Sequence, residues 1–254
     1  MADGPPVPGE RRIDWLKQFK AVLLAVGFVF VVRTVVAEPY HVPSASMVPT
    51  LLNGDELIAS KYAYGYSKYS PPIDLLPDFP GRLLGRPPQR GDVIVFRLPR
   101  EPSTTYVKRL IGLPGDRIQV SGGRLSINGA TAPRRLVGPF TGDIGRSGTA
   151  TLYIETLPGG SEHEIIEMSD ADRLDNTREY VVPPGHYFMM GDNRDNSVDS
   201  RIPENEGGVG FVPADNLVAR ADLVLLSRDP AVDLTHVAEW PHAFRMARLM
   251  GRIH

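Results

Sequence analysis

The sequence predicts a mainly β protein that follows a single membrane-spanning helix near its N-terminus. One long apolar run lies at residues 21–37, whereas the later apolar runs are short and strand-like. The 254 residues also include 25 glycines and 24 prolines, together about a fifth of the chain. This share is below the roughly 25–30% that is typical of low-complexity chains. We therefore interpret these residues as turns between many short strands.

The composition excludes several classes of function. With 42% hydrophobic and 23% charged residues, the chain has the composition of a globular protein. Its net charge of −2 gives no general electrostatic reason to expect nucleic acid as a partner. The absence of cysteine excludes disulfides, thiolate catalysis and cysteine-ligated zinc.

The apolar run follows a polar N-terminal segment, residues 1–20, which contains prolines and four Arg or Lys side chains. The uncharged stretch 21–32 is shorter than the ~17–25 residues that span a bilayer. Snorkelling of the Arg33 side chain toward the head groups extends the span to Ala37. The positive-inside rule then places the N-terminus in the cytoplasm and the residues after Ala37 outside it.

Two other interpretations of this segment stay open. A cleavable signal peptide fits the length of the apolar run, and Val35-Val36-Ala37 resembles a cleavage site with small residues. A buried core helix is the second alternative, against which the flanking charges argue. The anchor and the signal peptide both place the rest of the chain outside the cytoplasm.

The elements after the apolar run are predicted from local patterns. Three prolines in 38–49 argue against a helix, and six prolines in 67–90 indicate a long surface loop. We interpret residues 119–180 as a β-subdomain inserted into a β core of residues 38–118 and 181–227. Strands are expected at 57–59, 92–96, 105–111, 117–120, 124–127, 152–154, 187–190 and 217–226.

The C-terminal tail, residues 228–254, is predicted to contain a basic amphipathic helix. Apolar residues from Trp240 to Met250 recur at helical spacing, and Arg245, Arg248 and Arg252 fall on another face. A helix that packs on the domain is the ordinary interpretation, and contact with a membrane surface is the alternative.

Several catalytic motifs are absent from the sequence. The six histidines form no H-E-x-x-H or comparable ligand spacing, and there is no G-x-S-x-G, P-loop or G-x-G-x-x-G. We therefore expect no metal ion and no cofactor. A Ser-His-Asp triad of separated residues stays open, but no pattern indicates one.

Two residues in unusual surroundings are candidates for catalysis. Ser46 lies between Pro43 and Pro49, which suits a rigidly held nucleophile, although a polar loop after a membrane helix is an equally simple explanation. Lys108 lies inside an expected strand. If its side chain points inward, desolvation lowers its pKa, and the neutral amine is able to act as a general base. An exposed strand lysine is the alternative.

The loop 191–201 is rich in aspartate, asparagine and arginine. It superficially suggests a calcium loop, but it lacks the central glycine and the terminal glutamate of an EF-hand. We interpret it as a loop that is fixed by ion pairs and by hydrogen bonds from side chains to the backbone.

Taken together, three segments resemble the signature boxes of bacterial type I signal peptidases, the serine proteases that use a Ser–Lys dyad. These segments are PSASMVPTL (43–51), YVKRLIGLPGD (106–116) and GDNRDNSVDSR (191–201). GDELIASKYAYG (54–65) and RGDVIVF (90–96) also resemble family segments. The resemblance implies a signal-peptidase-like β catalytic core with an inserted β-subdomain, behind one N-terminal transmembrane helix.

The resemblance also implies roles for individual residues. Ser46 matches the nucleophile, and Lys108 matches its general base. Ser44 matches the residue whose hydroxyl joins the backbone N–H of the nucleophile in the oxyanion hole. Ser197 matches the serine that orients the lysine.

Further matches concern support and specificity. Asp199 and Arg201 match an ion pair that supports the loop. Ala45 stands where glycine is common in the family, so the turn must avoid a positive φ at this position. The positions that match the lining of the small substrate pockets are Val42, Met47, Leu51, Tyr106 and Val107.

The implied function is that of a membrane-bound serine endopeptidase, which cleaves signal peptides from exported preproteins after small residues through an acyl-enzyme. The implied partners are preproteins, the lipid bilayer and the nearby secretion translocon, with no nucleic acid. The implied location is the bacterial inner membrane, with one span, a cytoplasmic N-terminus and a periplasmic catalytic domain.

Three other functions are alternatives to signal-peptide cleavage. A specialised pilin-maturation peptidase would share the dyad and the topology, and its substrate range would distinguish it. A non-enzymatic, membrane-tethered β-domain would not need Ser46 or Lys108. Self-cleaving repressors share the dyad chemistry, but they need a helix-turn-helix where this chain has an apolar segment.

Overall fold

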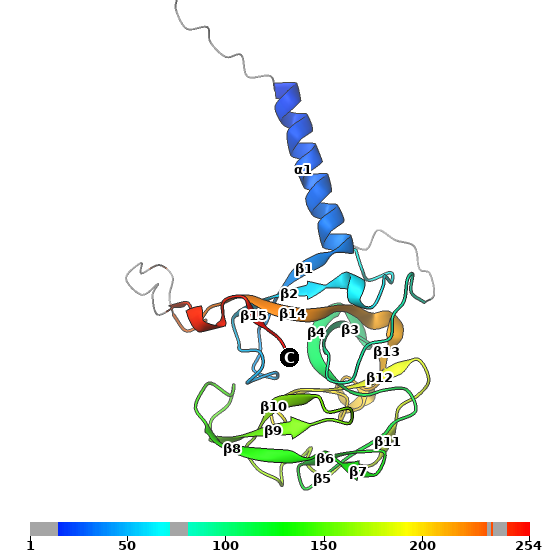
Figure 1. Cartoon of the computed structure of the whole chain (residues 1–254), viewed down its shortest axis with the longest axis vertical. Coiled ribbons are helices and arrows are strands. Elements are labelled where there is room, and N and C mark those ends of the chain that lie inside the picture. The colour runs from blue at the N-terminus through cyan, green and yellow to red at the C-terminus, as the bar shows by residue number, and fades with distance from the viewer. Residues whose placement is uncertain (1–14, 72–80, 233–234, 236–242) are drawn as a thin grey trace, which may run out of the picture.

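The structure is a computed structural model that describes residues 15–71, 81–232, 235 and 243–254. Most of the expected N-terminal segment, part of the expected loop 67–90, and Trp240 lie outside the described residues. Figure 1 shows one long helix that projects from a body built of strands. The mainly β class with one N-terminal apolar helix is therefore confirmed.

Helix α1 (Trp15–Val35) is long and apolar enough to cross a membrane. Its 21 residues correspond to ~30 Å at 1.5 Å per residue, which matches the hydrocarbon thickness of a bilayer. None of its residues is buried, so the alternative of a buried core helix is wrong. The helix begins at Trp15, earlier than the predicted span 21–37. It also ends before Ala37, because Ala37 already pairs with Ser60 as the first residue of a strand.

The larger sheet has eight strands in the order β1-β2-β14-β3-β4-β12-β13, and β15 also pairs with β14. All the pairings within it are antiparallel. Its strands are β1 (Ala37–His41), β2 (Asp55–Ser60), β3 (Val93–Leu98), β4 (Glu101–Gly112), β12 (His186–Met190), β13 (Val212–Pro213), β14 (Leu217–Ser227) and β15 (Gly251–Arg252). Strand β4, which has 12 residues and lies between β3 and β12, positions the site described below.

Two smaller sheets lie at the end of the body away from α1 (Figure 1). One has the order β11-β5-β6-β7, with β5 (Arg117–Ser121), β6 (Arg124–Ile127), β7 (Ala130–Thr131) and β11 (Tyr180–Val181). The other has the order β10-β9-β8, with β8 (Arg134–Phe140), β9 (Ala150–Thr156) and β10 (Glu162–Glu167). Short 3₁₀ helices occur at Lys61–Ala63, Glu204–Glu206, Ala214–Asn216 and Met246–Arg248.

The described part of the C-terminal tail corrects the prediction of a continuous amphipathic helix. After Ala243 the chain forms a single 3₁₀ turn and then strand β15. Met250 has a φ of 57°, which ends helical geometry at that residue. Arg248 does not lie on a free polar face, because it pairs with the buried Asp55 at 2.6 Å. A helical spacing of apolar residues cannot reveal this partner, which is nearly two hundred residues away.

Candidate active site

Ser46 lies in the turn between β1 and β2, on a segment that the core holds firmly. Its neighbours Met47 and Val48 are 0% and 1% exposed. Met47 packs in the cluster beneath the larger sheet, whereas Val48 packs in a second cluster with residues of β9 and β10. The turn is closed by backbone hydrogen bonds from Val48 N to Ala45 O at 3.2 Å and from Leu51 N to Met47 O at 2.9 Å. Apolar packing of these neighbours thus holds the turn that presents the Ser46 hydroxyl.

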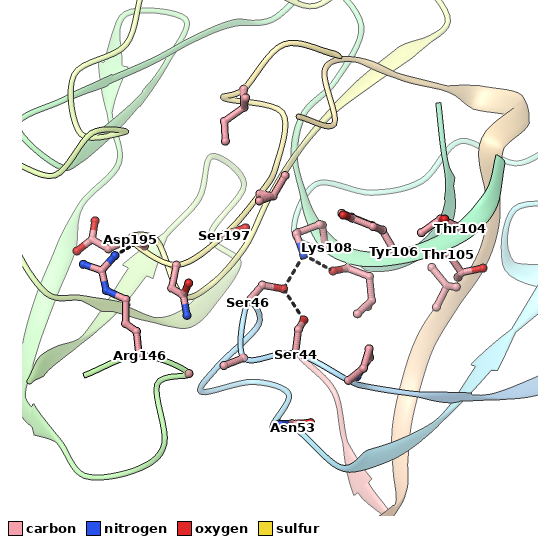
Figure 2. Close-up of a pocket in the computed structure, with 18 of the residues that line it drawn as sticks. Ser44, Ser46, Asn53, Thr104, Thr105, Tyr106, Lys108, Arg146, Asp195 and Ser197 are labelled. Carbon is pink, nitrogen blue, oxygen red and sulfur yellow. Dashed lines mark hydrogen bonds between the residues drawn. The ribbon is translucent and has the colours of Figure 1, made fainter. Parts of the chain in front are cut away.

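Lys108 reaches Ser46 from strand β4. Its Nζ donates hydrogen bonds to Ser46 Oγ at 2.6 Å and to the Val107 carbonyl at 3.0 Å (Figure 2). The side chain is 3% exposed, and burial lowers the pKa of Lys108 to about 8, although the carboxylates of Asp199 and Asp192 oppose this shift. A substantial neutral fraction of this amine is thus available near neutral pH, within hydrogen-bond reach of the hydroxyl.

Ser44 supplies a second hydroxyl to the same place. Its Oγ lies 3.3 Å from Ser46 Oγ, and the residue is exposed (Figure 2). Within the described ranges, no residue accepts a hydrogen bond from the Ser46 backbone N–H. Two donors, one hydroxyl and one backbone N–H, are therefore available beside the hydroxyl oxygen of Ser46.

Ala45 departs from the glycine that is common in the family, and the structure accommodates the difference. The positive φ angles of non-glycine residues in the described part of the chain do not include Ala45. The positive φ of +73° is instead at the facing Gly145, where an added Cβ would lie 2.6 Å from the Ala45 Cβ. The expectation that the turn avoids a positive φ at Ala45 is confirmed.

Through Gly191, the loop 191–201 packs against the turn that carries Ser46. A Cβ at this position would lie 2.4 Å from the Ser46 carbonyl oxygen and 2.3 Å from Ser197 Oγ, so glycine is required here. Ser197 is buried and lies close to Lys108 in Figure 2, but no hydrogen bond joins these two residues. The contact by which Ser197 would orient the lysine is therefore absent from this structure.

The Asp199–Arg201 ion pair is formed inside this loop. Arg201 Nε lies 3.0 Å from Asp199 Oδ1, and its second nitrogen lies 2.9 Å from Oδ2. Asp199 also accepts a hydrogen bond from Gly191 N at 3.1 Å. Both side chains of the pair are buried, and the guanidinium beside Asp199 holds the pKa of that carboxyl below its usual value despite burial.

A second buried ion pair was missed from the sequence. Arg109 is fully buried and binds Asp192 with two hydrogen bonds of 2.8 and 2.7 Å. Thr50 donates to the same carboxylate at 2.5 Å, and Asn193 N donates to the Ser46 carbonyl at 3.2 Å. These contacts connect strand β4, the turn that carries Ser46, and the loop 191–201. Arg109 and Asp192 stand in the matching segments, but sequence alone does not pair residues that lie 83 positions apart.

We predict that Arg109→Ala destabilises the protein strongly. Removing one partner of a buried ion pair leaves an uncompensated charge, which costs ~3–5 kcal/mol. The matched control is Arg117→Ala, which removes the exposed pair with Glu179 and should cost at most ~1 kcal/mol. Chemical unfolding of both variants measures the difference, and equal free energies of unfolding would contradict the structural role of Arg109.

A cleft of about 850 Å³ opens at the dyad. Ser46, Lys108, Ser44, Tyr106 and Val107 all line it, as the resemblance implied for Tyr106 and Val107. Its opposite wall comes from the segments 145–146, 172–174 and 195–198, of which only the last, with Ser197, was expected from the sequence. The mixed polar and apolar lining of this open groove suits an extended peptide.

The other three residues that were expected to line the substrate pockets do not line this cleft. Val42, Met47 and Leu51 are at most 1% exposed and belong to the hydrophobic cluster beneath the larger sheet, against which Val107 also packs. Direct contact between these three side chains and a bound peptide is therefore not supported. They shape the cleft from below by fixing the turn that carries Ser46.

Among the described residues, one group of carboxylates has the spacing of metal ligands: Glu167, Asp175 and Asp195. None of the three forms a hydrogen bond with Ser46 or Lys108. The sequence predicted no metal ligands, since the members of this group come from three separate segments.

The chain is similar to known proteins over most of its length. The family model described as "Signal peptidase, peptidase S26" matches residues 13–226. Signal peptidase I of Rickettsia typhi (strain ATCC VR-144 / Wilmington) is 40% identical over 219 residues, which are 83% of this chain and 80% of that protein. Signal peptidase I of Rickettsia akari (strain Hartford) is 41% identical over 203 residues, 77% of this chain and 74% of that one. A crystal structure of a signal peptidase I from Enterococcus faecalis V583 has 27% identity and a TM-score of 0.31, covering 53% of this chain and 97% of that one.

Proposed function

Since the chain belongs to the signal peptidase family, peptidase S26, and is a serine endopeptidase, we propose that it removes signal peptides with Ser46 as nucleophile and Lys108 as general base. The observation that carries this assignment is the 2.6 Å contact between Lys108 Nζ and Ser46 Oγ, at a lysine that is 3% exposed. Burial supplies the lowered pKa that a lysine base needs, and the contact supplies the path for the proton.

The proposed reaction follows from this geometry. Neutral Lys108 takes the proton of Ser46 Oγ as the oxygen attacks the scissile carbonyl. The Ser44 hydroxyl and the Ser46 N–H stabilise the oxyanion, a contribution of roughly 3–4 kcal/mol per donor in studied enzymes. Protonated Lys108 then gives its proton to the leaving amine, and the signal peptide remains as an ester on Ser46. Water, deprotonated by Lys108, hydrolyses that ester and restores the free serine.

We also propose that the site is held near the outer face of the inner membrane, with a cytoplasmic N-terminus and preproteins arriving from the translocon. Ser46 is the ninth residue after Ala37, so the chain between them is at most ~30 Å long when extended. The junction is fixed further by Glu38, which pairs with Arg33 of α1 at 2.5 Å and with the buried Lys61 at 2.6 Å. This rigid junction supports a catalytic body that stays close to the bilayer.

The function is tested with the full chain, purified in detergent, and a panel of unrelated preproteins whose mature N-termini are sequenced. We expect several preproteins to be cut after their signal peptides, without dependence on one substrate class. Cleavage of a single pilin-like substrate alone would favour the specialised peptidase, and no cleavage of any preprotein would contradict the proposal.

Substrates should need a small residue immediately before the cut. Tyr106 and Val107 line the cleft beside Ser46 and Lys108. The residues beneath this wall are closely packed, so the wall leaves little room for a large side chain. Replacing alanine before the cut with phenylalanine should lower kcat/KM by ~100-fold or more. Leucine for alanine at a mature-side position far from the cut is the control. Equal rates for the alanine and phenylalanine substrates would reject this pocket.

A further inference from the structure

Three carboxylates from different segments converge at the edge of the cleft. Glu167 is the last residue of β10, Asp175 lies in the connection between β10 and β11, and Asp195 belongs to the loop 191–201. One carboxylate oxygen of each lies within 4.8 Å of those of the other two. Glu167 and Asp175 are 3% and 1% exposed, so water does not solvate this group freely.

Each of the three carboxylates has one oxygen without a protein partner among the described residues. Glu167 Oε2, Asp175 Oδ1 and Asp195 Oδ1 are buried and make no hydrogen bond to any described residue. The second oxygen of each aspartate is engaged, since Asp195 Oδ2 accepts from Met168 N at 2.6 Å and Asp175 Oδ2 accepts from Asp172 N at 2.5 Å. Three buried, unpaired carboxylate oxygens in one place are costly in the ionised state, and a bound cation would compensate that charge.

The neighbouring arginines do not fill this role, because other carboxylates hold them. Arg194 is bound by Glu155 at 2.5 and 3.1 Å, and Arg201 is bound by Asp199. Arg134 binds Asp170 at 2.6 Å and lies 3.5 Å from the other oxygen of Glu167. Burial raises the pKa of Glu167 to about 8 and that of Asp175 to about 6, and neighbouring carboxylates add to both shifts.

We propose that Glu167, Asp175 and Asp195 bind one hard divalent cation, and that Ca²⁺ is the ion that fits them. The donors are all oxygens, which hard cations prefer. Two oxygens bound to one Ca²⁺ at 2.3–2.6 Å lie at most ~5 Å apart, and the observed separations satisfy this limit. Water and backbone carbonyls would complete the coordination, because three carboxylates provide fewer than the six to eight oxygens that Ca²⁺ takes.

Such a cation would connect the segment 167–175 to the loop that carries Ser197. Asp195 and Asp172 also line the cleft, and Arg146 on the same wall donates to the Asp195 carbonyl at 3.0 Å (Figure 2). The cation would therefore act as a structural tie for the cleft wall that faces the dyad, with no part in the proton transfer itself.

The test measures binding and stability, independently of any cleavage. The full chain in detergent is stripped with EDTA and dialysed against millimolar Ca²⁺ or Mg²⁺ at neutral pH. We expect one Ca²⁺ bound per chain and, with Ca²⁺ at ~100 times its Kd, a melting temperature that rises by ~5–10 °C. Asp175→Asn should lose both effects, whereas Glu164→Gln, which removes an exposed carboxylate from the same strand β10, should keep them.

The sign of the Asp175→Asn effect separates a cation site from an ordinary structural role. In the stripped protein this substitution relieves repulsion among the carboxylates, so the variant should melt at or above the wild-type temperature. In Ca²⁺ the order should reverse, because only the wild type gains the ion. Absence of bound cation in the wild type, or an equal Ca²⁺ response in Asp175→Asn, would overturn the proposal.

Discussion

Ser46→Ala is expected to abolish signal-peptide cleavage and to leave the fold intact. The substitution removes the oxygen that would carry the acyl group, so kcat should fall by at least ~10³-fold. Folding should survive, since among the described residues the Ser46 hydroxyl forms hydrogen bonds only with Ser44 and Lys108, while the turn is held by its backbone and by Met47. The measurement is preprotein turnover by purified, detergent-solubilised protein, with circular dichroism as the test of folding.

Ser126→Ala is the matched control for this variant. Ser126 lies on β6, in one of the smaller sheets, and its hydroxyl is 3.2 Å from that of Thr131. This variant should retain the wild-type rate. Full processing by a rigorously purified Ser46→Ala protein would exclude Ser46 as the nucleophile, and it would reopen the search for a triad among the separated histidines.

Lys108→Arg is expected to be inactive across the usable pH range. A guanidinium keeps its proton, so arginine cannot accept the proton of Ser46 even though it retains the positive charge and much of the length of lysine. The loss in kcat/KM should be at least ~100-fold, the lower end of what a general base contributes. Steady-state kinetics on the same preprotein provide the measurement.

The control for charge and surface change is Lys20→Arg, a substitution on an exposed position of α1. It should leave kcat/KM unchanged. Substantial activity in Lys108→Arg, or loss of activity in both variants, would contradict the assignment of Lys108 as the base.

Local pattern was sufficient for most of the strands, and it made Ser46 and Lys108 candidates. Short apolar runs predicted the positions of β3, β4, β12 and β14, because strands in the interior of a sheet are typically short, nearly continuous apolar segments. Ser46 and Lys108 stood out through their surroundings and then through the resemblance of three segments. Their 2.6 Å contact, across 62 positions of sequence, is what only the fold provides.

Several features depend on tertiary contacts that local pattern does not encode. The strand β1 contains Pro39 and was not expected, and it forms because its residues pair with β2 at the edge of the sheet. Met47 and Leu51 match pocket positions but lie in the core, since a matched position does not reveal which face its side chain takes. The arginines of the tail meet acceptors in distant segments, so an amphipathic spacing there did not produce a long helix.

The pH dependence of kcat/KM in the wild-type protein tests the dyad most directly. Lys108 must be neutral to accept the Ser46 proton, and burial places its pKa at about 8. Activity should therefore be low at acidic pH, rise through an apparent pKa near 8, and level off at higher pH until other groups titrate. A profile that is flat from pH 6 to 9, or one that rises with an apparent pKa near the ~6.5 of histidine, would contradict lysine as the base.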